Sequence, residues 1–177
     1  NKNSRYEGLC LRCCIYLRPD IQVLRNYKTK ELTVAAFVTT KFPDFTWIED
    51  KRVEGGCSAK RPDLLVDMGT HVVIIEIDEN KHGNYECSCE NKRIMEISQD
   101  NGHRPIVFIR FNPDGYTSVF GEKVKSCWIT NEQGINVIDK KKQKEWDRRL
   151  ECLEQTISYW TQNPTDKTIE TVHLFYE

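Results

Sequence analysis

The stretch Arg61–His82, Arg-Pro-Asp-Leu-Leu-Val-Asp-Met-Gly-Thr-His-Val-Val-Ile-Ile-Glu-Ile-Asp-Glu-Asn-Lys-His, decides the fold that the sequence predicts. A Pro-Asp pair opens an apolar strand, a turn follows at residues 68–70, and a second apolar strand ends in acidic residues. Strand side chains alternate between the two faces of a sheet, so Glu76 and Asp78 point the same way. If the two strands form a hairpin, Asp63 lies near the end of the second one. We therefore expect three carboxylates at one edge of a sheet.

Crowded carboxylates repel each other unless a cation lies among them, and hard oxygen ligands suit Mg²⁺. We expect Asp63 and Glu76 to bind Mg²⁺ or Mn²⁺, with Asp78 as a third ligand or a group that holds a ligand through water. His82 titrates near neutrality and is the favoured proton acceptor for an attacking water. Lys81, turned inward, is the alternative, because it could neutralise charge that develops on a phosphate. The plainer interpretation is that these acids cap a turn and form the solvated end of a strand.

Composition places the chain among globular proteins. Its 177 residues suffice for one domain, with 38% apolar and 30% charged residues. It has no apolar run of membrane-spanning length and no signal-peptide pattern, so we expect an intracellular protein of the cytoplasm or nucleus that is not secreted. The net charge of −1 means that nucleic-acid binding would require local basic patches.

A basic rim directly precedes the acidic cluster. Lys51, Arg52, Lys60 and Arg61 surround a single acid, Glu54, in the loop before the first strand of the hairpin. A solvated loop is the ordinary explanation for such charges. Beside a metal-binding carboxylate cluster, the same four residues are candidates for binding phosphate groups of a nucleic acid.

The order of the elements predicts one α/β (α+β) domain over residues 1–177 with a central mixed sheet. We expect an irregular N-terminal segment, a core of helix, three strands, helix and strand, and a C-terminal extension with a hairpin, a long helix and a closing strand. The irregular segment is expected over residues 1–28. The core is expected over 29–111, with a helix over 30–42, a strand over 45–53, the hairpin, a helix over 89–101 and a strand over 104–111. The extension is expected over 112–177, with a hairpin of 124–129 and 135–138, a helix from 140 and a strand over 169–176. An apolar stripe along the long helix is expected to contact the core: Trp146, Leu150, Leu153, Ile157 and Trp160.

Eight cysteines are many for a chain of this length. With no secretory signal, the pairs Cys10-x-x-Cys13 and Cys87-x-Cys89 favour structural zinc in a reducing compartment over a disulfide framework. The spacing lacks the second Cys-x-x-Cys of the usual zinc site, so free buried thiols are the alternative.

Glu31, in the first turn of the helix over 30–42, complements the helix dipole.

The order of elements, with Pro-Asp on one strand and Glu-x-Asp on the next, resembles the PD-(D/E)xK, or restriction-endonuclease-like, nuclease superfamily. The lysine that usually follows the acid by two residues is replaced by Asp78. The order Asp63, Glu76, His82 is more similar to the branch typified by the very short patch repair endonuclease, in which an Asp binds the metal and a His assists catalysis. Some homing endonucleases of this branch add a Glu from the first helix, which Glu31 matches.

The resemblance is closest to uncharacterised proteins of giant DNA viruses and algae and covers most of the chain. It rests on five motifs: Asn26-Tyr-Lys-Thr-Lys-Glu, Lys60-Arg-Pro-Asp-Leu-Leu, Ile75-Glu-Ile-Asp-Glu-Asn-Lys-His, Cys87-Ser-Cys-Glu-Asn-Lys-Arg and Gly102-His-Arg-Pro-Ile-Val-Phe-Ile-Arg-Phe-Asn-Pro-Asp. It implies a Mg²⁺-dependent endonuclease that acts on DNA in nicking, repair or homing, without a membrane or a small-molecule cofactor. A homodimer acting on a duplex is left open.

The resemblance also implies where zinc would bind. In the very short patch repair family, Cys and His hold a structural zinc close to the catalytic hairpin. Cys87 and Cys89 lie in the matching region. Cys10 and Cys13 are the expected further zinc ligands, and Cys57 is the alternative ligand. Two other functions compete with the nuclease. One is a nuclease fold that binds nucleic acid without cleaving it, and the other is a zinc-stapled protein-interaction domain whose acidic cluster is only surface.

Overall fold

The computed structural model describes residues 8–18, 20–21, 28–51, 61–79 and 87–176; for 11, 12 and 87–91 it describes the backbone only. A five-stranded mixed sheet forms its centre, in the order β1 (Ile48–Glu49), β2 (Leu64–Asp67), β3 (Val72–Ile77), β4 (Ile106–Phe111) and β9 (Ile169–Leu174). Strands β1 to β3 pair antiparallel, whereas β4 and β9 join β3 in parallel pairing. The expected α/β class with a mixed central sheet is confirmed.

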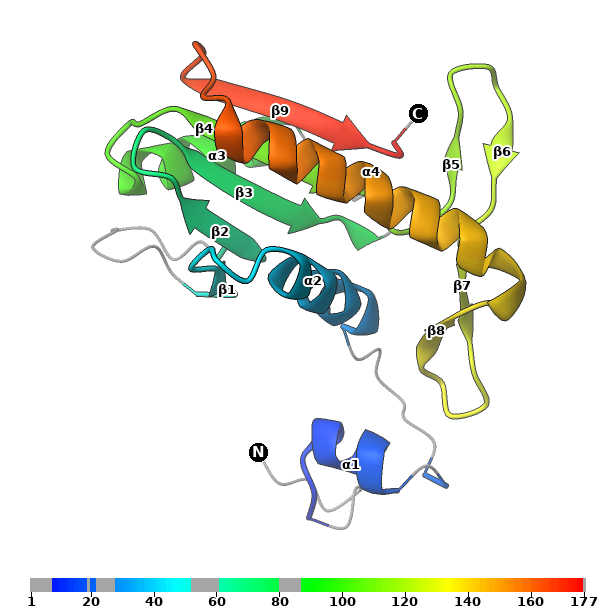
Figure 1. Ribbon diagram of the computed structural model, residues 1–177. Helices are drawn as coiled ribbons and strands as arrows, with labels where there is room; N and C mark the ends of the chain where they lie inside the picture. The colour runs from blue at the N-terminus through cyan, green and yellow to red at the C-terminus, as the bar shows by residue number, and fades with distance from the viewer. Residues whose placement is uncertain (1–7, 19, 22–27, 52–60, 80–86, 177) are drawn as a thin grey trace.

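Helices cover both faces of this sheet (Figure 1). On one face, α2 (Thr29–Lys41) and α4 (Gln143–Gln162) pack on a large apolar cluster that includes Ile75 and Ile109. On the other face, α3 (Cys87–Asp100) places Ile97 on a smaller cluster with Ile74. Strands β3 and β4 are buried on both sides, which explains their unbroken apolar sequence. The chain thus runs through helix, three strands, helix and strand in the predicted order.

Two expectations about the first half of the chain need correction. The N-terminal segment is not wholly irregular, because α1 (Leu11–Leu17) forms there with Cys10 at its N-cap. Residues 52 and 53 of the strand expected over 45–53 lie outside the described residues, and its described part forms a strand only at β1. Phe42, Phe45 and Trp47 instead pack against one another before it, with ring centroids 5.9 to 6.5 Å apart. Asp50, with φ of +42°, ends extended backbone directly after it.

The hairpin expected from 124–129 and 135–138 forms with shorter strands, and a second hairpin that was not predicted precedes it. Strand β5 (Tyr116–Thr117) pairs with β6 (Lys123–Val124), and β7 (Trp128–Thr130) pairs with β8 (Asn136–Ile138). The chain turns between them at Ser126, whose hydroxyl accepts a hydrogen bond from the Trp128 N–H at 3.1 Å. The sequence pattern missed this turn because it contains neither Gly nor Pro.

The last two elements follow the prediction with shifted ends. Lys140–Lys142 form a 3₁₀ turn and α4 begins only at Gln143. The stripe Trp146, Leu150, Leu153 and Ile157 is buried, as expected, with Trp160 packed at its edge. Strand β9 ends at Leu174, because Phe175 takes a φ of +64°. Within the described residues, no helix is long and apolar enough to cross a membrane.

Candidate active site

Strands β2 and β3 bring Asp63 and Glu76 side by side. Leu64 pairs with Ile75, so the residue before Leu64 faces the residue after Ile75 across the hairpin. The Oδ2 atom of Asp63 accepts a hydrogen bond from the Ile77 N–H at 2.7 Å, which fixes this carboxylate against β3. Ile75 and Ile77 point into the cluster under α2 and α4, so Glu76 emerges on the face that α3 covers.

Burial sets the charge state of both carboxyl groups. It raises the pKa of Asp63 to about 6, against a lowering by the Ile77 N–H. It also raises the pKa of Glu76 to about 8; the Arg93 charge lowers that pKa, and the Asp63 and Asp78 charges raise it. At neutral pH these neighbouring groups therefore resist being ionised together. A cation between them would favour the doubly ionised state.

Arg93, the last residue of the motif Cys87–Arg93 but given no role by the sequence reasoning, pairs with Glu76. Its Nη2 atom donates to both Glu76 oxygens at 2.8 Å and to the Arg61 carbonyl oxygen at 3.4 Å. Arg93 precedes Ile97 by one helical turn, and Ile97 is buried against the sheet. The helical spacing was the signal that could have placed Arg93 on the sheet-facing side of α3. Its side chain is 40% exposed, so it has room to move away from Glu76.

Asp78 belongs to a different group of side chains. Its Oδ2 atom accepts hydrogen bonds from Arg110 Nε at 2.7 Å and from the hydroxyl of Tyr176. In the parallel pairs, Glu76 lies opposite Arg110 and Arg110 lies opposite His173. A row of polar residues thus runs from Asp63 across four strands. Asp78 ties the end of β3 to β4 and to the C-terminal segment, and its predicted role as a metal ligand stays a prediction.

Helix α2 contributes charges to the same environment. The Glu31 charge raises the pKa of Asp63, and Glu31 Oε1 accepts a hydrogen bond from Lys28 Nζ at 3.0 Å. Lys30, almost fully buried, pairs with Asp114 at 2.6 Å and approaches Glu79 at 3.9 Å. These contacts anchor the first turn of α2 at the end of β3. The predicted catalytic part of Glu31 is compatible with this position.

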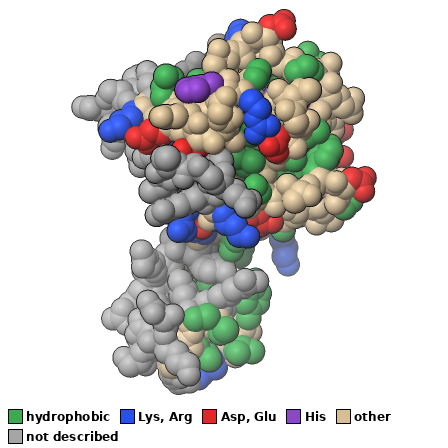
Figure 2. Space-filling model, turned by 90° about the vertical axis from the view of Figure 1, so that its left-hand side faces the viewer, with side chains coloured by type: hydrophobic (Ala, Val, Ile, Leu, Met, Phe, Trp, Pro, Cys, Tyr) green, Lys and Arg blue, Asp and Glu red, His purple; other side chains and the backbone are tan. Residues whose placement is uncertain are grey.

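Several predicted residues lie outside the described part of the chain: Lys81, His82, Arg52 and Lys60. Of the basic rim, Lys51 and Arg61 are described, and both are exposed. Figure 2 shows the end of the molecule where β3 begins, and there Lys and Arg side chains alternate with Asp and Glu. On this view, which shows the end of β3 opposite to Glu76, the described residues form no broad basic field.

The structure describes the side chains of only some of the predicted zinc ligands. Cys10 accepts a hydrogen bond at its sulfur from the Cys13 N–H at 3.4 Å. The side chains of Cys87 and Cys89 in α3, and Cys57 altogether, lie outside the described residues. Figure 1 shows α1 below α2 and separate from α3. The zinc site therefore stays a prediction, and one that would need α1 and α3 to approach each other.

The donor set at the hairpin fits a magnesium ion. Among the described residues, no group of three or more His, Cys, Asp or Glu side chains is arranged to hold a metal. Mg²⁺ does not need such a cage, because proteins commonly bind it through one or two carboxylates, water and substrate phosphates. Asp63 and Glu76 supply two carboxylates on adjacent strands, and Asp63 Oδ2 is already oriented by a backbone N–H.

Known proteins supply no relative for this arrangement. No family model, no curated protein and no solved structure matches the chain. The class of protein must therefore be inferred from the chemistry of the site itself.

The raised pKa of Glu76 predicts a pH-dependent stability of the metal-free protein. An acid whose pKa is raised by folding binds protons more tightly when folded, so stability is lost as the pH rises from its ordinary pKa of 4.5 to about 8. At about 1.4 kcal/mol per pKa unit, the loss is on the order of a few kcal/mol. Glu76→Gln should remove most of it. Urea unfolding in EDTA between pH 5 and 8 measures the effect.

Asp67→Asn is the matched control. Asp67 lies at the other end of β2, and its hydrogen bond to Arg104 lowers its pKa instead of raising it. The variant should keep the wild-type decline of stability above pH 5. A Glu76→Gln protein that declines as steeply as the wild type would contradict the assignment of the raised pKa to Glu76.

Proposed function

We propose that the protein is a Mg²⁺-dependent endonuclease that hydrolyses phosphodiester bonds of DNA, built on a restriction-endonuclease-like core. The observation that carries this proposal is the pair Asp63 and Glu76 on adjacent strands, whose buried carboxyl groups favour a divalent cation. The sequence of α2, β1, β2, β3, α3 and β4 follows the order implied by the resemblance. The charge of Glu31 on α2 acts on Asp63.

Each described residue has a part in this proposal. Asp63 and Glu76 would hold the ion, which when bound polarises the scissile phosphate and lowers the pKa of water. Glu76 must then release Arg93, and the freed guanidinium would bind a phosphate oxygen of the substrate. Arg61, next to Pro62 at the start of the hairpin, is exposed at the same place and suits a neighbouring phosphate.

Proton transfer is assigned by sequence to the segment that follows β3. His82 would accept the proton of the attacking water, with Lys81 as the alternative that stabilises charge on the phosphate. General acid–base assistance of this kind contributes about 10²–10⁴-fold to a rate. Lys51, Arg52 and Lys60 would extend the phosphate-binding surface.

One observation favours a second candidate, a nuclease fold that binds nucleic acid without cleaving it. Glu76 is paired with Arg93, and Asp78 is paired with Arg110. A site that had lost its metal would neutralise its carboxylates in this way. The exposure of Arg93 still leaves it free to leave Glu76, which is why we rank this candidate second.

Plasmid nicking separates the two candidates. We expect the protein to nick or linearise supercoiled plasmid DNA in Mg²⁺ or Mn²⁺ and to be inactive in EDTA. The same reactions with single-stranded DNA and RNA define the substrate. Binding of DNA in a mobility-shift assay, with no cleavage in either metal, would favour the binding module. Cleavage that persists in EDTA would contradict the metal mechanism.

A further inference from the structure

The tip of the β5–β6 hairpin exposes two adjacent apolar side chains. Val119 is 78% and Phe120 is 89% exposed, the highest values among the large hydrophobic side chains that the structure describes. Single exposed apolar residues are common on protein surfaces, but an adjacent pair at the end of a projecting turn presents a small apolar edge to solvent.

Hydrogen bonds hold this tip in one conformation. The Ser118 N–H donates to the Glu122 carbonyl at 2.8 Å, and the Gly121 N–H donates to the Ser118 carbonyl at 2.8 Å. The Ser118 hydroxyl also accepts from the Glu122 N–H at 3.1 Å. Gly121 takes a φ of +81°, which favours glycine. The apolar pair is therefore presented on a closed turn.

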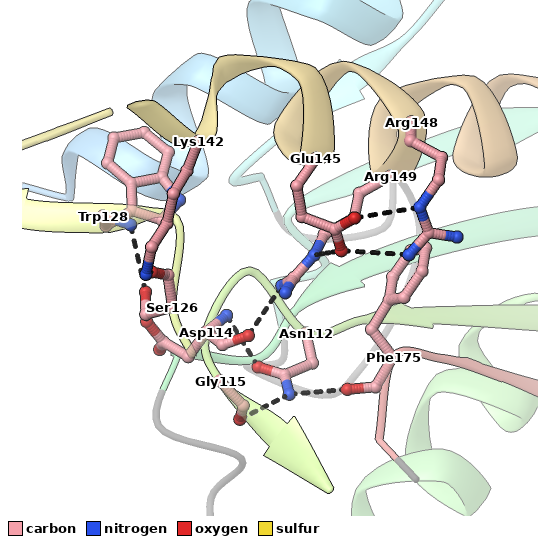
Figure 3. Close-up of polar contacts among 10 residues, drawn as sticks. All are labelled: Asn112, Asp114, Gly115, Ser126, Trp128, Lys142, Glu145, Arg148, Arg149 and Phe175. Carbon is pink, nitrogen blue, oxygen red and sulfur yellow. Dashed lines mark hydrogen bonds and ion pairs between the residues drawn. The ribbon is translucent and has the colours of Figure 1, made fainter. Parts of the chain in front are cut away.

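The root of the hairpin is fixed to the core (Figure 3). Asn112 Nδ2 donates to the Phe175 carbonyl at 2.8 Å, and its Oδ1 accepts from the Asp114 N–H at 2.9 Å. Arg149, fully buried, donates from Nη1 to the Asp114 carbonyl at 2.7 Å. At Gly115 a Cβ atom would lie 3.0 Å from the Val124 carbonyl oxygen, so the two strands approach closely there. These contacts tie the root of the hairpin to α4 and to the C-terminal segment at Phe175.

Lysines lie along the second strand and at the root of the hairpin, and one exposed acid, Glu122, lies at its tip. Lys123 and Lys125 are exposed on its second strand and just beyond it. At the root, Lys142 Nζ donates to the Ser126 carbonyl at 2.5 Å, which packs the lysine run of residues 140–142 against the hairpin. Lysines 140 and 141 themselves are exposed. An apolar tip with cations behind it complements DNA, whose stacked bases are apolar and whose flanking phosphates are anionic.

The hairpin also leaves the sheet at the edge where the candidate site lies. Strands β3 and β4 are parallel, so the end of β3 after Glu76 and the end of β4 that leads to β5 are at the same edge. Figure 1 shows the β5–β6 hairpin projecting from this edge. We propose that Val119 and Phe120 insert between base pairs of duplex DNA bound at the site, while the lysines of the hairpin and its root bind the flanking phosphates. Apolar side chains inserted in this way unstack a base step and bend the duplex. The inference rests on the proposed action on DNA.

Insertion can be measured without cleavage. Duplexes carrying 2-aminopurine at successive positions are mixed with the protein in EDTA, and a rise in fluorescence reports an unstacked base. We expect a rise at one or a few positions with the wild type and a several-fold smaller rise with Phe120→Ala. Both tip side chains are exposed, so this variant should unfold at the wild-type temperature. Tyr159→Ala removes an exposed aromatic side chain from α4 and should leave the signal unchanged.

The outcomes separate this inference from the proposed function. A rise that Phe120→Ala abolishes, in a protein that cleaves no DNA, supports insertion and contradicts the nuclease. Cleavage of duplex DNA with equal fluorescence in wild type and Phe120→Ala overturns insertion and leaves the nuclease in place. Failure to bind any duplex overturns insertion. Binding to phosphatidylserine vesicles that requires Phe120, without a fluorescence rise on DNA, overturns it in favour of a membrane surface.

Discussion

Asp63→Asn is expected to reduce DNA cleavage at least ~100-fold while the protein stays folded. The change removes a metal-binding oxygen, and metal polarisation of a phosphate contributes several kcal/mol to the transition state. A loss of about 3 kcal/mol corresponds to roughly 100-fold in rate. Asparagine has the shape of aspartate, and its carbonyl oxygen can still accept the Ile77 N–H. Since burial already raises the pKa of Asp63 to about 6, a neutral side chain suits the site without metal.

The measurement is single-turnover cleavage of supercoiled plasmid, accompanied by thermal unfolding in EDTA. Asp67→Asn is again the matched control, because Asp67 lies on the same strand but is exposed and paired with Arg104 at 2.7 Å. It should cleave at the wild-type rate. Wild-type cleavage by Asp63→Asn would remove Asp63 from the metal site. Loss of cleavage together with an unfolded protein would instead show that Asp63 is structural, in which case Glu76→Gln would decide whether the site binds metal.

The sequence predicted those parts of the fold that depend on local periodicity. Alternating and continuous apolar runs located β2, β3 and β4, and the 3.6-residue stripe from Trp146 to Ile157 located α4. The Gly69 turn, with φ of +80°, then determined the hairpin and so brought Asp63 to Glu76. The central geometry of the site followed because both acids lie on one hairpin, whose register depends on a short turn.

The remainder of the site depends on contacts between distant segments. Arg93 reaches Glu76 from α3, and Tyr176 reaches Asp78 from the end of the chain, 98 positions away. No local sequence pattern indicates which strand lies next to β4. The row of polar residues from Glu76 through Arg110 to His173, on three neighbouring strands, could therefore not be predicted. The strand at β1 was predicted too long for a related reason: tertiary packing in the group of Phe42, Phe45 and Trp47 outweighs propensity there. The short helix α1 was missed altogether.

Arg149 lies within the predicted apolar stripe of α4, but the sequence reasoning gave it no role. It lies three residues after Trp146 and four before Leu153, so helical spacing places it inside the apolar stripe of α4. An arginine at that position means either that this face of α4 is not buried or that the guanidinium is buried and has hydrogen-bond partners. The structure shows the second case: Arg149 is fully buried, with Nε 3.1 Å from Glu145 Oε1.

We expect Arg149→Ala to lower the free energy of unfolding by about 3–5 kcal/mol. The variant would leave a cavity, which costs about 2–5 kcal/mol for large buried side chains. It would also deprive the Asp114 carbonyl of a donor that lies at 2.7 Å, at a cost of about 1–3 kcal/mol. The guanidinium lies 5.1 Å from the Tyr116 ring and 5.3 Å from the Phe175 ring, so two further contacts disappear. Urea denaturation at neutral pH gives the value directly.

Arg148→Ala provides the control for position and charge. Arg148 is the neighbouring residue and bonds the same Glu145 carboxylate at 2.9 Å, but its side chain is 56% exposed. Exposed ion pairs contribute about 0–1 kcal/mol, so this variant should lose no more than that. Arg149→Met then separates volume from hydrogen bonding, because methionine fills most of the cavity and leaves the Asp114 carbonyl without its donor. Equal losses for the Ala variants at 148 and 149 would show that burial of the Arg149 guanidinium does not hold the root of the β5–β6 hairpin.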